Sequence, residues 1–262
     1  MASLFYLLTR RLMQRRAVHP AGRVAEMKGP AMMVLAGLPL LLAGCGGAGS
    51  SSAAQSSTGA SAAAGTGGPA YSADQLRQAL LLQVSGYHPA GPADAGEYGS
   101  MRAIQNFNQL QNQIKLDKPQ CAGASQAFSM SPEVRTAPAA VMTFAKDNGQ
   151  TLSETLISVS AGTATAQVKQ RVPAGCRNFR VQVGGQWVND QVTEAPGTRI
   201  GDGSRTVGVV TTSGTARVRT WYVVLHSRSY LATVMLHGAA VTKDQVEGFA
   251  RQAYEQAERI LP

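Results

Sequence analysis

The chain has 262 residues, of which 44% are apolar and 15% are charged. This composition allows a packed core and excludes a wholly disordered chain. The net charge of +9 is typical of a nucleic-acid-binding protein, but residues 1–44 alone carry six basic side chains against one acidic side chain. Because that segment is expected to be removed, the remainder carries only +4 and we expect no nucleic-acid partner.

Residues 1–44 are organised like a secretory signal. Met27 and Lys28 precede an uncharged run rich in Leu, Met, Val and Ala. This run is too short to span about 30 Å of hydrocarbon, which requires roughly 20 residues. A basic start, a short apolar centre and a small-residue cleavage site instead indicate a signal peptide. Since the bases before Met27 lie far from the apolar run, we expect translation to start at Met27.

The signal ends in Leu42-Ala43-Gly44-Cys45, which resembles the bacterial lipobox. The resemblance implies that the Cys45 thiol receives a diacylglycerol group and that the chain is cleaved directly before it. We therefore expect a protein anchored by lipid to the extracytoplasmic face of the cell membrane. The alternative is an ordinary signal peptide with an incidental cysteine.

Residues 46–70 consist of Gly, Ser, Ala, Thr and Pro, apart from Gln55. Such a segment buries too little apolar surface to fold and behaves as a flexible tether with a span of about 25–30 Å. The predicted organisation is thus a signal (1–44), a lipidated Cys45 with its tether (45–70), and one folded domain (71–262).

Two helices are expected at the ends of the folded domain. Ser72-Ala-Asp-Gln75 and Thr242-Lys-Asp-Gln245 are typical of capping boxes. Apolar residues follow each box at helical spacing. They are Leu76, Leu80 and Val84 in the first helix, which Gly86 is expected to end, and Val246, Phe249, Ala250, Ala253, Ala257 and Ile260 in the second. A weaker third helix is predicted from Ala164 to Val172.

Strand signals fill the region between the helices. Segments rich in Val, Thr, Tyr and Trp are separated by short turn-like connections such as Asn148-Gly149. The expected strands are 141–144, 152–159, 179–183, 187–192, 206–211, 217–225 and 230–236. Short connections favour antiparallel pairing over crossovers. We predict an α+β fold in which one antiparallel sheet is flanked by N- and C-terminal helices.

Cys121 and Cys176 remain after Cys45 is assigned to lipid. In an exported domain two cysteines favour a disulfide. A bridge closing this loop would stabilise the fold by roughly 4 kcal/mol in the chain-entropy model. The alternative is a reactive thiol or a metal site, although no histidine is close to either cysteine in the sequence.

Five landmarks between residues 71 and 262 resemble the PknH-like extracellular sensor-domain family of actinobacterial lipoproteins. They are Leu80-Leu-Leu82 before Gly86-Tyr87, Cys121 after a proline, the segment Glu154-Thr-Leu156 before an Ala/Thr-rich helix, Cys176-Arg-Asn-Phe179, and a closing hairpin with an amphipathic helix. The resemblance implies an antiparallel sheet flanked by helices, with a cleft for an extracellular ligand. Kinase-linked members carry a second disulfide and a transmembrane kinase half, neither of which matches this sequence.

Motifs of common enzyme classes are absent from the sequence. There is no Gly-x-Ser-x-Gly elbow, His-Glu-x-x-His motif or phosphate-binding Gly-Lys-Ser/Thr loop, and Gly201-Asp-Gly203 is expected to be a plain turn. The histidines of the exported part are His88, His226 and His237, and the last two are expected at opposite ends of a hairpin.

Four acids are candidates for paired hydrolytic carboxylates, although side chains of this kind are usually solvated. They are Glu154, Asp190, Glu194 and Asp202. We expect no catalytic residue, no metal and no cofactor.

The best candidate for ligand binding is the strand that contains Arg217, Arg219 and Trp221. Alternation along a strand places these three residues on one face. Cations beside an aromatic ring suit an anionic or carbohydrate ligand. The alternative is an exposed strand face whose arginine stems cover apolar surface.

Two functions therefore remain open. The first is a lipid-anchored, non-catalytic sensor-like or ligand-binding domain that takes a small or anionic envelope ligand. The second is an accessory or scaffold lipoprotein that contacts another envelope protein. An envelope hydrolase is a more distant alternative. A pocket lined by Trp and Arg favours the first function, and a flat exposed apolar patch favours the second.

Overall fold

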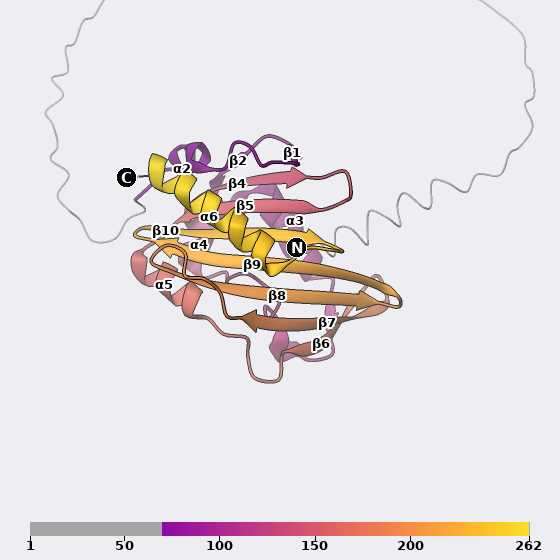
Figure 1. Ribbon diagram of the computed structural model, residues 1–262. Coiled ribbons are helices and arrows are strands. Elements are labelled where there is room, and N and C mark those ends of the chain that lie inside the picture. Colours follow the sequence, from indigo (N-terminus) through magenta and orange to yellow (C-terminus); the bar gives the residue numbers. More distant parts are fainter. Residues whose placement is uncertain (1–69, 262) are drawn as a thin grey trace, which may run out of the picture.

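A computed structural model describes residues 70–261 (Figure 1). The predictions of a signal, a lipidated Cys45 and a tether concern residues outside this range. Within the described range, no helix has both the length and the apolar character needed to cross a membrane.

A sheet of 10 antiparallel strands forms the centre of the domain. It contains every strand predicted from the sequence. These strands are β4 (Pro138–Ala145), β5 (Thr151–Ser158), β6 (Asn178–Val183), β7 (Gln186–Ala195), β8 (Gly203–Ser213), β9 (Ala216–Ser227) and β10 (Tyr230–Gly238). Three short strands that were not predicted pair at the margins, namely β1 (His88–Pro89), β2 (Asp94–Glu97) and β3 (Lys115–Leu116).

The strand order is β1-β4-β5-β10-β9-β8-β7-β6-β3, with β2 paired to β4. Strands β6 to β10 form a continuous meander, and β10 returns to pair with β5 of the preceding β4–β5 hairpin. The turn of that hairpin contains Gly149 at φ +81°, a conformation that favours glycine. The predicted antiparallel meander is therefore confirmed.

Helices lie on both faces of the sheet. The helices α2 (Ala73–Ala79) and α6 (Lys243–Ile260) pack on one side, which we call the α6 face. The opposite side, the α3 face, carries α3 (Arg102–Gln111), α4 (Pro132–Thr136) and α5 (Ala161–Lys169), together with the short 3₁₀ turns η1 (Tyr98–Ser100) and η2 (Pro119–Cys121). The predicted α+β fold and both capping boxes are confirmed.

The helix predictions need four corrections. The first helix ends at Ala79, because Leu80 is extended and its neighbour Leu81 bonds to the sheet instead of continuing the helix. The third helix spans Ala161–Lys169 because Ser160, not a later residue, is its N-cap. The helices α3 and α4 were not predicted from the sequence.

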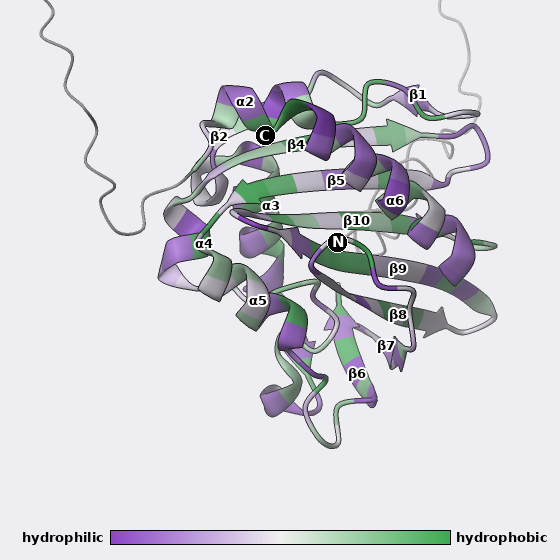
Figure 2. Ribbon diagram, turned by 60° about the vertical axis from the view of Figure 1, so that its left-hand side comes forward, coloured by the Kyte–Doolittle hydropathy of each residue, from purple (hydrophilic) through white to green (hydrophobic). Residues whose placement is uncertain are grey.

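Each face of the sheet has its own apolar core. On the α6 face, Val223 and Leu225 of β9 lie in the same core as Val246 and Ala250 of α6. On the α3 face, Tyr222 and Val224 of β9 share a core with the disulfide cysteines. Figure 2 shows hydrophobic residues along the strands and hydrophilic residues on the outward side of α6. The alternation of β9 therefore decides which residues face which core.

Candidate functional site

The predicted disulfide between Cys121 and Cys176 is present. Their Cα atoms are 5.3 Å apart, and the bridge joins positions separated by 55 residues. It ties η2 to the segment that enters β6. The ammonium of Lys118 donates to the backbone oxygens of Gly175 and Asn178 at 3.1 and 2.7 Å, so the same two segments are joined a second time.

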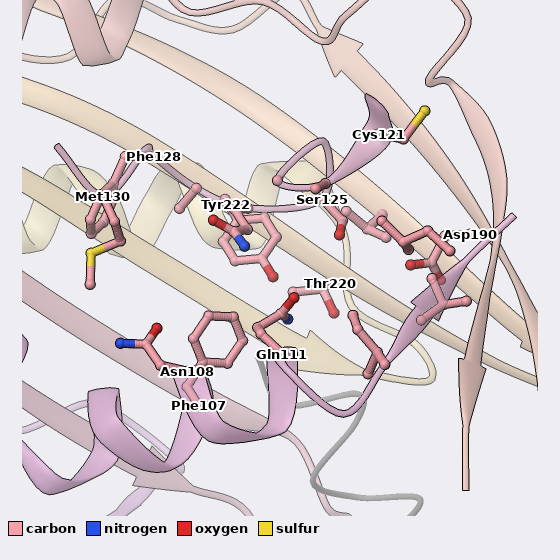
Figure 3. A pocket seen from close by; sticks show the side chains of 18 of the residues that line it. Phe107, Asn108, Gln111, Cys121, Ser125, Phe128, Met130, Asp190, Thr220 and Tyr222 are labelled. Carbon is pink, nitrogen blue, oxygen red and sulfur yellow. The ribbon is translucent and has the colours of Figure 1, made fainter. Parts of the chain in front are cut away.

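This bridge borders a cavity of about 90 Å³ between the sheet and the helix α3. Helix α3 and the loop 122–130 form its walls, and strands β6 to β9 form its floor (Figure 3). The wall side chains include Phe107, Asn108 and Gln111 from α3, and Ser125, Phe128 and Met130 from the loop. The predicted strands thus supply one side of the cavity, and α3, which was not predicted, supplies part of the other.

The apolar surface of the cavity comes largely from the α3-face core. Ile104 on α3, Phe128 in the loop and Val188 and Val209 in the sheet are all buried and line it. Polar side chains are interspersed among them, such as Asn108 and Gln111 on α3. An apolar wall with a small number of placed polar groups is typical of a small-molecule site.

The polar groups of the floor lie on neighbouring strands. The Thr211 hydroxyl donates to Asp190 Oδ1 at 2.7 Å. The Thr220 hydroxyl and His237 Nδ1 are 3.0 Å apart. Asp190, Thr211 and Thr220 line the cavity, and His237 stands behind Thr220 on β10. The floor therefore offers two hydrogen-bonded pairs that orient polar atoms below the apolar walls.

Burial shifts the pKa of each of these groups in the direction that favours its neutral form. It raises the pKa of Asp190, and the hydrogen bond from Thr211 opposes this change. Burial lowers the pKa of His237 to about 4, so the imidazole is neutral at physiological pH. The pKa of Tyr222, which also lines the cavity, rises because of burial and the nearby Asp190 carboxylate. The phenol consequently stays protonated.

The size of the cavity restricts what it accepts. Sites for drug-sized molecules usually measure about 300–1,000 Å³, several times the roughly 90 Å³ available here. A slender alkyl group or a small ring matches the space, whereas a nucleotide does not. Within residues 70–261, no three His, Cys, Asp or Glu side chains gather as a metal-ligand set.

The residues predicted to bind a ligand lie on the opposite face of the sheet from the cavity. Arg217, Arg219 and Trp221 share the α6 face, as their alternation predicts. Trp221 packs against the α6-face core and lies over Gly208 of β8, so its ring is only partly accessible. Arg217 is exposed and Arg219 is half-buried. The structure does not bring them to the cavity, and their binding role stays a prediction.

The four acids considered for hydrolysis are dispersed. Glu154 is fully buried on the α6 face, so the expectation that it is solvated is wrong. Asp190 and Glu194 lie on the α3 face of β7, and Glu194 accepts the N–H of Val172 at 3.0 Å. Asp202 is exposed in a turn and accepts the N–H of Arg228. Glu154 therefore faces away from Asp190 and Glu194 across the sheet.

The two hairpin histidines are also separated. His226 pairs with Leu231 and His237 with Thr220, so they lie at opposite ends of the β9–β10 hairpin, as predicted. Six positions along β9 correspond to about 20 Å. This distance prevents the two imidazoles from sharing a metal ion.

No family model and no curated protein matches the chain. Among solved structures, it is similar to the extracellular domain of PknH from Mycobacterium tuberculosis, with 13% identity and a TM-score of 0.47 over 74% of this chain and 97% of that one. It is also similar to a putative uncharacterized protein from Mycobacterium smegmatis, the Rv0999 ortholog, with 10% identity and a TM-score of 0.44 over 72% and 98% of the two chains. The first similarity agrees with the PknH-like resemblance of the sequence motifs, and neither identifies a ligand.

Proposed function

We propose that this chain is an extracytoplasmic, lipid-anchored protein whose folded domain binds a small, largely apolar ligand without chemically changing it. The ligand enters the cavity between α3 and the sheet. Its apolar part contacts the walls, and one polar end meets the Asp190–Thr211 or Thr220–His237 pair. The observation that carries this proposal is the combination of a largely apolar lining with two hydrogen-bonded polar pairs on the floor.

The location outside the cytosol is supported by two independent features. The first feature is the signal and lipobox pattern of the sequence, which indicates export. The Cys121–Cys176 bridge in the folded domain suits an oxidising compartment.

The electrostatics of the floor support binding over catalysis. An efficient general base has a pKa near the working pH, whereas that of His237 is lowered to about 4. Asp190 lies on β7 and His237 on β10, with β8 and β9 between them, so the carboxylate does not orient the imidazole as the third member of a triad would. Hydrogen-bonded pairs of this kind instead recognise a polar group at the end of an apolar ligand.

The experiment uses n-octanol as a probe, because its alkyl chain is slender and its hydroxyl can both donate and accept. Adding increasing amounts of n-octanol to the exported chain should raise its melting temperature up to a plateau, because a ligand that binds only the folded state stabilises that state. Ser125→Trp places a large ring at the cavity wall and should abolish the rise. Ser85→Trp is the matched control, because Ser85 is exposed in the segment after α2. Stabilisation that survives Ser125→Trp, or none in the wild type, contradicts the proposal.

A further inference from the structure

The α6 face of the sheet is only partly covered by its helix. Helix α6 packs on β10, β9 and part of β8, while β7 and β6 lie beyond it (Figure 1). Along β7 the residues on this face are exposed, including Trp187, Asn189 and Gln191. Exposure of alternate residues indicates that this part of the sheet meets solvent.

The strand register arranges the uncovered residues in rows. One row crosses four strands through Arg180, Asn189, Thr212 and Arg217. The next row on one side contains Asn178, Gln191, Val210 and Arg219. The next row on the other side, on the same face of the sheet, contains Lys115, Gln182 and Trp187. We call this surface the arginine face; it comprises Lys115, Asn178, Arg180, Gln182, Trp187, Asn189, Gln191, Val210, Thr212, Arg217 and Arg219.

The arginine face has a strongly positive charge balance. None of its positions is Asp or Glu, and four are Lys or Arg. The neighbouring Asp117 is bound by Arg180, whose Nε lies 3.0 Å from Oδ2. Asp190 and Glu194 belong to β7 but face the other side of the sheet. Because strands are about 4.8 Å apart, Arg180 and Arg217 hold positive charge at points roughly 14 Å apart.

An aromatic ring is held within this positive surface. Trp187 is 43% exposed, an unusual exposure for so large a side chain. The Arg180 guanidinium lies 5.2 Å from its ring centroid. Since Arg180 is itself bonded to Asp117, the indole rests against a fixed neighbour. A positioned, accessible indole is a stacking platform for a flat apolar surface.

We infer that the arginine face binds an acidic polysaccharide of the cell envelope. Guanidinium groups pair with carboxylates or phosphates in bidentate geometry. The amides of Asn178, Gln182, Asn189 and Gln191 donate to and accept from sugar hydroxyls, and Trp187 stacks on a sugar ring. Charge complementarity alone also suits an anionic membrane, but the four amides both donate and accept, which matches sugar hydroxyls better than lipid phosphates, whose oxygens only accept. The uncovered strands form a broad surface that accommodates an extended chain.

The test uses polygalacturonate as the acidic polymer, dextran as the neutral polymer, and vesicles of phosphatidylglycerol. The protein is the exported full chain with Cys45→Ser, so that lipid on Cys45 does not contribute. Polygalacturonate should bind with an affinity that falls with salt, and more tightly than dextran. Arg217→Ala with Arg219→Ala should weaken binding about tenfold, since two partly exposed charge pairs are lost. The salt dependence should become shallower in the same variant.

Two further variants separate a specific site from general charge attraction. Trp187→Ala should weaken binding about threefold while the salt dependence stays unchanged, because stacking is not ionic. Arg102→Ala with Arg251→Ala removes the same charge from exposed positions on α3 and α6, and should leave binding unchanged. Equal losses in this control and in the Arg217/Arg219 variant overturn the inference. So does binding to the vesicles but not to polygalacturonate. The cavity variant Ser125→Trp lies on the opposite face of the sheet from the arginine face. A negative result for the cavity ligand therefore does not affect the arginine-face inference, and the reverse also holds.

Discussion

The backbone N–H of Leu81 donates to Oε2 of Glu154 at 2.8 Å, across 73 residues of sequence. This bond joins the end of α2 to the middle of β5. Glu154 is 0% exposed, and none of the described residues is a hydrogen-bond partner for its Oε1. Its register neighbours Met142 and Val234 are apolar, and Arg77 of α2 is bound to Asp74. Burial consequently raises the pKa of Glu154 to about 7.

The raised pKa predicts that stability falls as the pH rises from about 4.5 to about 7. In this window the unfolded chain releases the Glu154 proton and the folded chain keeps it, so protons favour the folded state. Glu154→Gln keeps an acceptor for Leu81 but cannot ionise. The variant should be more stable than the wild type by on the order of 1–3 kcal/mol at pH 8 and nearly equal at pH 4. Urea unfolding at both pH values measures this, and an equal difference at the two pH values would exclude the explanation.

A second prediction concerns Gly208 and the Trp221 ring above it. A Cβ at position 208 would lie 2.6 to 2.9 Å from three atoms of the indole, closer than packing permits. Gly208→Ala should therefore destabilise the fold by about 1–3 kcal/mol. In Trp221→Ala the ring is gone, so adding Gly208→Ala should cost little. A double-mutant cycle by chemical denaturation measures the coupling, and additive effects would show that the ring yields without strain.

The sheet could be predicted from the sequence, whereas the cavity could not. Alternating β-branched and aromatic residues, as in 217–225, identify a strand from local pattern alone. Leu76, Leu80 and Val84 repeat at helical spacing, yet α2 stops at Ala79 because Glu154, distant in sequence, captures the N–H of Leu81.

Helix α3 was missed because its sequence is rich in Asn and Gln, which obscure the spacing of Ile104 and Phe107. The cavity lies where this helix, the disulfide loop and five strands come together, and no local sequence pattern predicts that arrangement. Arg217, Arg219 and Trp221 were correctly placed on one face, but the sequence did not show that the cavity lies on the other.

The disulfide gives a third prediction. Cys176→Ala opens the bridge between η2 and β6 and should lower the free energy of unfolding by roughly 2–5 kcal/mol. Because Cys121 borders the cavity, the same variant should also weaken the stabilisation by n-octanol. Calorimetry with and without n-octanol gives both values. Unchanged stability would mean that Lys118 and its backbone acceptors hold the loop without the bridge.

A fourth prediction concerns membrane attachment. If Cys45 carries lipid, the mature protein should partition into the detergent phase on phase separation, and Cys45→Ser should move it to the aqueous phase. Lys28→Ala is a useful comparison, since it alters the signal but keeps the thiol. Detergent partitioning of Cys45→Ser equal to that of the wild type would remove the lipoprotein assignment.

The central claim, that the cavity between α3 and the sheet holds a small apolar ligand, is tested most directly by native mass spectrometry of the chain purified from its own envelope. We predict a non-covalent adduct on the wild type and on Ser85→Trp, and its loss from Ser125→Trp, whose ring occupies the cavity wall. A wild-type protein without an adduct, or an adduct that Ser125→Trp retains in equal amount, would contradict the claim.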